Sequence, residues 1–191
     1  MDHADHVQLL AAGVPRRAGV WADFGAGGGA FTLALRELAG AAAEIYAVDA
    51  DGRSLDSLKK AMERRFPGSA PWLVRADFTQ PIELPVLDGI VAANSLHFVP
   101  FGRQVEVLRL WRDYLAPAGR LILVEYDADD GNRWVPYPIS FARLSGLAGQ
   151  AGLSAPERLA ERPTRIMGRM YSAQLTPHPL APSPQRVEEG E

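Results

Sequence analysis

The sequence predicts an α/β fold in which helices cover both faces of a doubly wound, mostly parallel sheet. Short apolar segments alternate with segments whose apolar residues recur every three or four positions, which is typical of strands alternating with helices. The chain has 191 residues and is 47% hydrophobic, which is enough for one domain with its own core. A glycine cluster at 25–29 follows the first apolar segment. Because parallel strands need crossover connections, this alternation indicates βαβ units.

Five parallel strands are predicted in the first two thirds of the chain. They are short apolar runs at 20–24, 44–48, 72–75, 87–93 and 121–126. Helices are predicted between them at 30–39, over a face with Leu55, Leu58, Met62 and Phe66, and over a face with Val105, Leu108, Trp111 and Leu115. Gly40 is placed to end the first of these helices, and Pro117 with Gly119 to end the third.

The pattern changes after the fifth strand. A helix is predicted over 140–153, and two extended stretches within 156–176, meeting near Pro163, predict an antiparallel hairpin that ends the sheet. The segment 1–13 contains a predicted helix at about 4–12. The segment 177–191 is rich in proline and glutamate, so we expect a disordered tail there. The sequence therefore predicts one domain over residues 14–176.

Charge and cysteine content exclude several classes of function. The 20 basic residues against 23 acidic residues give a net charge of -3, which offers no basic surface for nucleic acid or an anionic membrane. The chain has no cysteine, which excludes disulfides, thiolate metal sites and cysteine nucleophiles. We expect a cytoplasmic protein without membrane contact, because no signal peptide and no apolar run of spanning length is visible.

The glycine cluster predicts a turn that a nucleotide can approach closely, because glycine has no Cβ to obstruct the ligand. Gly25, Gly27 and Ala30 fit the G-x-G-x-x-G/A fingerprint of dinucleotide sites. Asp49 follows the second strand, where a carboxylate can bind ribose hydroxyls. These features keep an NAD-dependent oxidoreductase as an alternative, although the chain has neither a Tyr-x-x-x-Lys pair nor a second catalytic domain.

With Asp23 in front, the same glycines fit D-x-G-x-G-x-G, and the run VWADFGAGGGAFTLAL closely resembles motif I of class I S-adenosylmethionine-dependent methyltransferases. Four later segments follow in the order of that family: IYAVDAD, VRADFTQP, GIVAANSLHFVP and LRLWRDYLAPAGRLILVEYD. The resemblance covers about 14–176. It implies a Rossmann-like, seven-stranded sheet in the order 3-2-1-4-5-7-6 with strand 7 antiparallel, and methyl transfer from S-adenosylmethionine that yields S-adenosylhomocysteine.

The resemblance also implies a set of cofactor-binding residues. They are Asp23, Gly25, Ala26, Gly27, Asp49, Ala50, Asp77, Phe78 and Asn94. The glycines would let the methionine part cross the loop, with Asp23 and the backbone near Asn94 around its charged groups. Asp49 would accept both ribose hydroxyls. Asp77 would accept the adenine amine, and Phe78 or a neighbour of Asp49 would cover the ring. The alternative for Asp77 is a turn-forming acid, and for Asp23 a buried acid held by backbone amides.

The acceptor site is expected beside His97, which follows the fourth strand. Methyl transfer from a sulfonium is an in-line displacement, so alignment matters most, with a base where the nucleophile carries a proton. His97 is the candidate base, or alternatively a residue that shapes the pocket. Tyr126 is a second catalytic candidate. Arg133, Trp134 and Tyr137 are candidate substrate-binding residues, unless the aromatic rings pack over the next helix.

The predicted acceptor is a small molecule. The segment after the fourth strand lacks the Pro-Pro-aromatic run of enzymes that methylate base amines, and the absence of cysteine excludes carbon-5 pyrimidine chemistry. No cluster of acids and histidines suits a metal-dependent type, so no metal is expected. We expect a monomer or homodimer. A non-catalytic S-adenosylmethionine-binding subunit stays open as an alternative.

Overall fold

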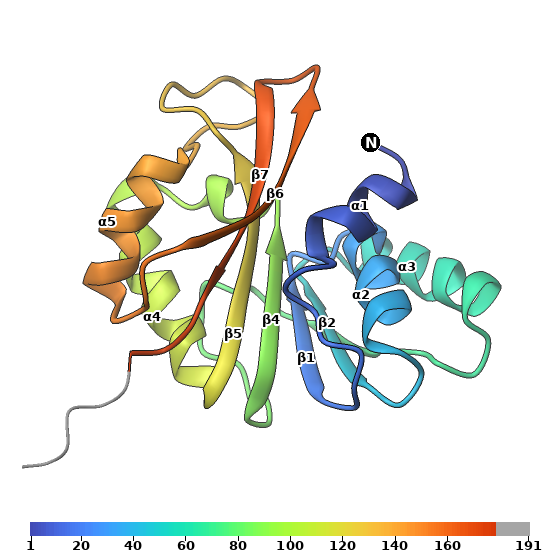
Figure 1. Ribbon diagram of the computed structural model, residues 1–191. Coiled ribbons are helices and arrows are strands. Elements are labelled where there is room, and N and C mark those ends of the chain that lie inside the picture. The colour runs from blue at the N-terminus through green and yellow to red at the C-terminus, as the bar shows by residue number, and fades with distance from the viewer. Residues whose placement is uncertain (179–191) are drawn as a thin grey trace, which may run out of the picture.

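The computed structural model describes residues 1–178 and arranges them around one seven-stranded sheet (Figure 1). The strand order is β3-β2-β1-β4-β5-β7-β6, with β1 to β5 parallel and β7 antiparallel to both of its neighbours. The strands are β1 (Val20–Phe24), β2 (Glu44–Asp49), β3 (Trp72–Arg75), β4 (Leu87–Ala93), β5 (Leu115–Tyr126), β6 (Glu157–Thr164) and β7 (Gly168–Leu175). The predicted fold class and strand order are confirmed.

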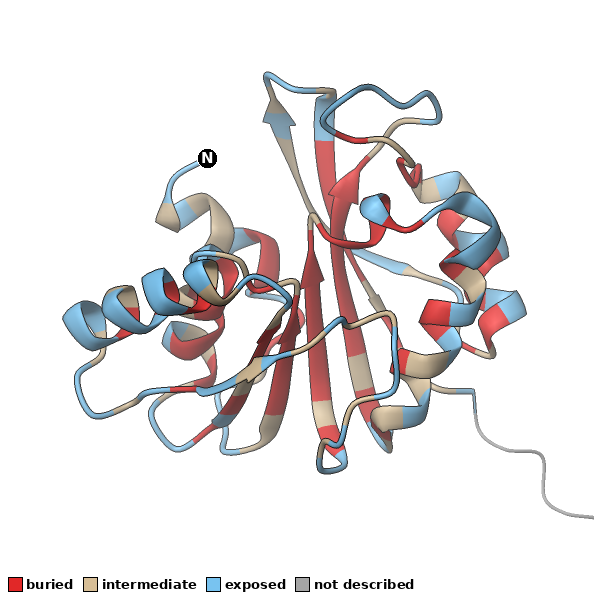
Figure 2. Ribbon diagram, turned by 180° about the vertical axis from the view of Figure 1, so that it is seen from behind, coloured by how far each residue is buried: buried red, intermediate tan, exposed pale blue. Residues whose placement is uncertain are grey.

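Helices pack on both faces of this sheet. They are α1 (His3–Leu10), α2 (Ala30–Ala39), α3 (Gly52–Arg65), α4 (Gln104–Tyr114) and α5 (Phe141–Ala151), with short 3₁₀ helices η1 (Leu96–Phe98) and η2 (Phe101–Arg103). Figure 1 shows α1, α2 and α3 on one face and α4 with α5 on the other. Neighbouring residues of one strand pack on opposite faces of the sheet. Trp21 packs on the face covered by α1 and α2, and Ala22 on the face covered by α4 and α5. Figure 2 shows buried residues continuing along the central strands.

The start of β5 and the position of the hairpin turn differ from the sequence prediction. The long strand β5 begins at Leu115, because Leu115 pairs with Leu87 before an irregularity shifts the register to Gly89 and Arg120. Pro117 and Gly119 therefore lie within β5 and do not stand between a helix and a strand. The hairpin turn occupies 165–167 and not the region of Pro163, which lies inside β6 opposite Arg169. Because β6 is an edge strand, a proline without an N–H group is tolerated there.

The first helix, the last helix and the predicted tail differ slightly from their predicted limits. α1 spans His3–Leu10 and not 4–12, and α5 spans Phe141–Ala151 and not 140–153. The first two residues of the predicted tail are attached to the fold: Pro177 bridges Leu153, and the His178 N–H donates to the Gly152 carbonyl at 3.0 Å. The rest of that segment, 179–191, lies outside the described residues. Within 1–178, no helix is both long and apolar enough to cross a membrane.

Candidate active site

The loop between β1 and α2 turns sharply, with glycines at the left-handed positions. Gly25 has φ 76°, Gly27 has φ 51° and Gly29 has φ 94°. The Gly25 N–H donates to the Val48 carbonyl of β2 at 2.9 Å. A Cβ on Gly25 would lie 2.6 Å from Cβ of Ser95, so the segment after β4 packs directly against this loop. Glycine is therefore required at 25 both for backbone conformation and for space.

Asp49 holds the glycine loop in place from the end of β2. Its Oδ2 accepts the Gly27 N–H at 2.8 Å, and its Oδ1 accepts the Asp51 N–H at 2.8 Å. Each carboxylate oxygen keeps a second lone pair, so the group can still accept hydroxyl donors from a ligand. Asp49 therefore holds the glycine loop and can still accept hydrogen bonds from a ligand.

Asp23 lies beneath the loop and is buried. The Thr32 hydroxyl donates to its Oδ2 at 2.6 Å. Burial raises the pKa of Asp23 to about 7, with a further increase from the nearby Asp49 charge and an opposing decrease from the Thr32 hydrogen bond. Its partner is thus a hydroxyl on α2, not the set of backbone amides considered from the sequence.

Two side chains after β4 carry buried polar atoms that have no partner within residues 1–178. These atoms are Oδ1 of Asn94 and Oγ of Ser95. Asn94 also has φ 54°, the one positive φ of a non-glycine residue in the described range. Buried polar atoms nearly always have a hydrogen-bond partner. Two such atoms without a partner beside a cavity therefore suit a bound ligand with polar groups.

A cavity of about 710 Å³, here named the glycine-loop cavity, opens at the carboxyl ends of β1, β2 and β4. Its lining includes His6, Asp23, Gly25, Ala26, Gly27, Phe31, Asp49, Ala50, Phe78, Asn94, Ser95 and Phe98. Asp77 is the one predicted cofactor-binding residue outside this lining. Its Oδ1 accepts the Thr79 N–H at 2.9 Å and the Thr79 hydroxyl at 2.8 Å, an arrangement typical of a turn-forming acid.

A second cavity of about 460 Å³, here named the His97 cavity, adjoins the first. It is lined by Asn94, His97, Phe98, Tyr126, Trp134, Val135 and Ile166. Asn94 and Phe98 line both cavities, so a ligand in one can contact a ligand in the other. Burial, with a smaller contribution from Glu125, raises the pKa of Tyr126, which therefore stays protonated near neutral pH.

The predicted substrate-binding residues are only partly brought together. Trp134 lines the His97 cavity, although 63% of its surface is exposed. Arg133 is not part of the lining, and its guanidinium lies 4.5 Å from the centre of the Trp134 ring. Tyr137 packs edge-on against Phe101, with ring centres 5.3 Å apart. The Tyr137 N–H donates to the His97 carbonyl at 3.0 Å, so Tyr137 supports the cavity from behind.

His97 forms a buried pair with Glu125, which the sequence had not singled out. His97 Nδ1 lies 2.7 Å from Glu125 Oε2, and both side chains are almost fully buried. Glu125 Oε1 also accepts the backbone N–H groups of Leu96 at 3.0 Å and His97 at 3.2 Å. With Nδ1–H donated to the carboxylate, Nε2 of His97 carries the lone pair and can accept a proton. The feature of the sequence that identifies Glu125 as a candidate is an acid near the end of an otherwise apolar strand.

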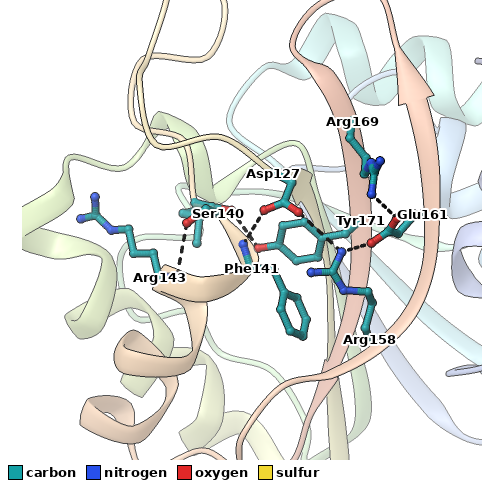
Figure 3. A network of polar contacts seen from close by, with 9 residues as sticks. Asp127, Ser140, Phe141, Arg143, Arg158, Glu161, Arg169 and Tyr171 are labelled. Carbon is teal, nitrogen blue, oxygen red and sulfur yellow. Dashed lines mark hydrogen bonds and ion pairs between the residues drawn. The ribbon is translucent and has the colours of Figure 1, made fainter.

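The loop 127–140 contributes Trp134 and Val135 to the lining of the His97 cavity. A polar network anchors the ends of this loop (Figure 3). Asp127 Oδ1 accepts the Phe141 N–H at 2.8 Å, and the Tyr171 hydroxyl donates to the Ile139 carbonyl at 2.9 Å. Arg158 of β6 lies 3.9 Å from the centre of the Phe141 ring and 3.5 Å from Asp127 Oδ2. These contacts join the end of β5, the start of α5 and the hairpin. Within residues 1–178, no group of His, Asp and Glu is arranged to hold a metal ion.

Several solved methyltransferases share the fold of this chain. The CcbJ methyltransferase from Streptomyces caelestis is 17% identical with a TM-score of 0.70, and the match covers 93% of this chain and 90% of that protein. Magnesium protoporphyrin IX methyltransferase from Synechocystis PCC 6803, solved with bound SAM, is 17% identical with a TM-score of 0.69 (92% and 77%). The O-methyltransferase NcsB1 from neocarzinostatin biosynthesis is 23% identical with a TM-score of 0.66. That match covers 83% of this chain and 49% of NcsB1, so this chain spans about half of its length.

Sequence comparison assigns the chain to a family. A probable cobalt-precorrin-6B C(15)-methyltransferase (decarboxylating) from Methanothermobacter thermautotrophicus is 26% identical in an alignment of 144 residues that covers 72% of this chain and 71% of that protein. The family model described as a methyltransferase domain matches residues 22–119, from within β1 into β5. Because this match covers more than half of the chain, the protein belongs to the methyltransferase domain family.

Proposed function

We propose that the protein transfers the methyl group of S-adenosylmethionine to a small-molecule acceptor whose nucleophile carries a proton. The observation that carries this proposal is the pair of adjoining cavities. One is lined by the glycine loop and Asp49, the other by His97, and Asn94 with Phe98 line both. Donor and acceptor can therefore meet at the shared wall, which is the arrangement that an in-line displacement needs.

The residues of the glycine-loop cavity fit the cofactor. Asp49 would accept the ribose hydroxyls, and Phe78 would cover the adenine ring. The unpartnered Oδ1 of Asn94 would accept from the ammonium group, because it is buried without a donor among residues 1–178. The adenine contact expected of Asp77 stays a prediction. The Synechocystis enzyme was solved with SAM and NcsB1 with S-adenosylmethionine, which supports this choice of cofactor.

In the proposed reaction, His97 removes the proton of the attacking group. Bound S-adenosylmethionine supplies a methyl group on a positively charged sulfur. Nε2 of His97 accepts the proton as the nucleophile attacks, and the Glu125 carboxylate, 2.7 Å from Nδ1, stabilises the imidazolium that forms. Tyr126 lines the same cavity, and its ring centre lies 5.7 Å from that of His97. We expect Tyr126 to orient the acceptor.

The size and lining of the His97 cavity support a small acceptor. A volume of about 460 Å³ bounded mainly by apolar side chains is typical of a small-molecule site. NcsB1 was solved in complex with 2-hydroxy-5-methyl naphthoic acid and with 1,4-dihydroxy-2-naphthoic acid. A monomeric or homodimeric state and a cytoplasmic location stay predictions.

Calorimetric titration with S-adenosylmethionine, S-adenosylhomocysteine and NAD tests the cofactor. We expect binding of the first two and none of NAD. Asp49→Ala should weaken S-adenosylhomocysteine binding by about 10- to 150-fold, or roughly 1.5 to 3 kcal/mol, the range for a hydrogen bond to a charged group. Asp56→Ala is the matched control, because Asp56 is exposed on α3 outside the glycine-loop cavity. No binding of either sulfur compound at millimolar concentration would refute the proposal.

Transfer of a labelled methyl group from S-adenosylmethionine to a panel of phenols, alcohols, amines and thiols tests catalysis separately. A labelled product that is lost in a His97→Gln variant supports the proposed base. Cofactor binding without transfer to any member of a broad panel favours the alternative of a non-catalytic subunit.

A further inference from the structure

The amino-terminal helix α1 forms one wall of the glycine-loop cavity. Leu9 and Leu10 of this helix are fully buried in the core cluster on the α2 side of the sheet. His6, one turn earlier, lines the cavity. The His6 ring lies against the Phe31 ring of α2, with ring centres 4.7 Å apart. A residue far from the glycine loop in the sequence therefore contributes to the cavity.

Contacts at the amino end of α1 help to fix the position of His6. Asp2 and Asp5 form reciprocal hydrogen bonds of 3.0 and 3.1 Å that cap the helix. Asp5 also pairs with Arg162 of β6 at 3.4 Å, and His3 pairs with Glu37 of α2 at 2.8 Å. The helix is thus held against both α2 and the hairpin, and the imidazole of His6 is held at the cavity.

His6 is the basic side chain among those that line the glycine-loop cavity in the described part of the chain. The lining also contains the acids Asp23 and Asp49, both on the sheet. Burial, followed by the positive charges of the amino terminus and His3, lowers the pKa of His6. A neutral imidazole still has one N–H donor, so it can bind an anionic group without carrying a charge in the empty cavity.

The beginning of α2 beside His6 is also suited to an anion. Gly29 precedes the helix and no side chain caps its first N–H groups. Such uncapped amino ends attract negative charge through their free N–H donors and the helix dipole. Phe31, which contacts His6, lies in this first turn. Two independent features, an imidazole and an uncapped helix end, therefore meet at one edge of the cavity.

The strand order determines which part of the cofactor would lie at this edge. Asp49 ends β2, on the β3 side of β1, whereas Asn94 follows β4 on the opposite side. If Asp49 binds the ribose, the methionyl part extends towards β4 and the amino end of α2. Its carboxylate is the anionic group of the cofactor. We propose that His6 and the amino end of α2 bind this carboxylate, an inference that rests on the proposed function.

Two ligands that differ in the amino-acid part test the proposal by calorimetry. S-adenosylhomocysteine carries the carboxylate, and 5′-methylthioadenosine lacks the whole amino-acid group. His6→Ala should weaken S-adenosylhomocysteine binding by about 10- to 150-fold, the range for one hydrogen bond to a charged group, and leave 5′-methylthioadenosine binding unchanged. His6→Gln, which keeps an N–H donor, should recover part of the loss. Gln8→Ala is the matched control, because this residue of α1 is exposed and is not in the lining.

Each other outcome overturns the inference. Equal weakening of both ligands by His6→Ala would show that His6 acts through the packing of α1. The same selective loss from Gln8→Ala would show that the effect is not specific to His6. Unchanged binding of both ligands, with or without a change in acceptor KM, would show that His6 does not contact the cofactor. If the wild-type protein bound neither ligand, the proposed function itself would fail, and this result is distinct because it does not depend on any variant.

Discussion

The imidazole of His97 and the carboxylate of Glu125 are joined by a 2.7 Å hydrogen bond between two elements that are remote in the sequence. The same carboxylate accepts two backbone N–H groups at the start of η1. Glu125 therefore fixes both the ring and the segment that carries it. Under the proposed function, this pair sets the direction in which the base faces.

Replacing Glu125 by Gln should abolish base catalysis and retain cofactor binding. The amide can donate to Nδ1, which moves the imidazole proton to Nε2 and leaves that nitrogen without a free lone pair. We expect kcat to fall by about 10² to 10⁴, the usual contribution of a positioned base. His97→Gln and the double variant should show the same loss, because residues that act as a unit are not additive. A change confined to KM would instead assign His97 to shaping the pocket.

Gly25→Ala should destabilise the protein more than Gly27→Ala. Both positions have positive φ, which costs an alanine about 1 to 2 kcal/mol. Only Gly25 adds a clash, since its Cβ would lie 2.6 Å from that of Ser95, whereas nothing lies closer than 4.0 Å at Gly27. Overpacking adds about 1 to 3 kcal/mol. Urea denaturation measures the difference, and Ser95→Gly should restore part of the loss in the Gly25→Ala protein. Equal losses at both glycines would contradict the packing argument.

Asp23 should make the free energy of unfolding depend on pH. Burial raises the pKa of Asp23 to about 7 from its ordinary value of 3.8, so the folded state binds the proton more tightly than the unfolded state. This contribution is fully present below about pH 4 and is lost as pH rises to about 7. A shift of this size corresponds to about 4 kcal/mol.

The side chain of Asn resembles that of a protonated Asp and does not titrate, so Asp23→Asn mimics the protonated form of Asp23. The stability difference between the wild type and Asp23→Asn, measured by urea denaturation, should therefore decline between pH 4 and 7. A difference that is constant over this interval would show that Asp23 does not titrate there.

Gln104→Leu should loosen the His97 cavity. The buried Gln104 amide donates to the Val99 carbonyl at 3.1 Å and to the Tyr137 carbonyl at 3.0 Å, joining the two loops around the cavity. Removing it leaves two buried acceptors, which costs about 1 to 3 kcal/mol. We expect faster hydrogen exchange at the Tyr137 N–H, a higher acceptor KM and unchanged S-adenosylhomocysteine binding. Gln150→Leu is the control, because that amide bonds only to the Gly146 carbonyl of its own helix in the described structure. A parallel loss of cofactor binding would contradict this local role.

Local features of the sequence could be predicted well, because their causes lie within a few residues. The glycine loop and Asp49 depend on a turn beside a strand end, and eight of the nine predicted cofactor-binding residues line the glycine-loop cavity. The hairpin turn was misplaced, since Pro163 is tolerated on an edge strand that no local pattern identifies. The start of β5 was also misplaced, because Leu115 is held by pairing with Leu87.

The residues that the sequence did not reveal depend on contacts between remote segments. Glu125 meets His97 across 28 positions, and His6 reaches the cavity only because α1 docks on α2. Conversely, Arg133 and Tyr137 lie in the expected loop but outside the cavity lining, since Arg133 lies over the Trp134 ring and Tyr137 packs edge-on against Phe101. Loop composition alone does not determine which side chains point inward.

The antiparallel direction of β7 returns the hairpin turn, 165–167, to the edge where the parallel strands end. Ile166 of this turn lines the His97 cavity, and none of the hairpin lines the glycine-loop cavity. Under the proposed function, a designer could exchange this turn for one of another length to change which acceptors are admitted, and leave the donor half untouched. Apart from Asn94 and Phe98, which line both cavities, the two halves of the reaction are thus encoded in different stretches of one small chain.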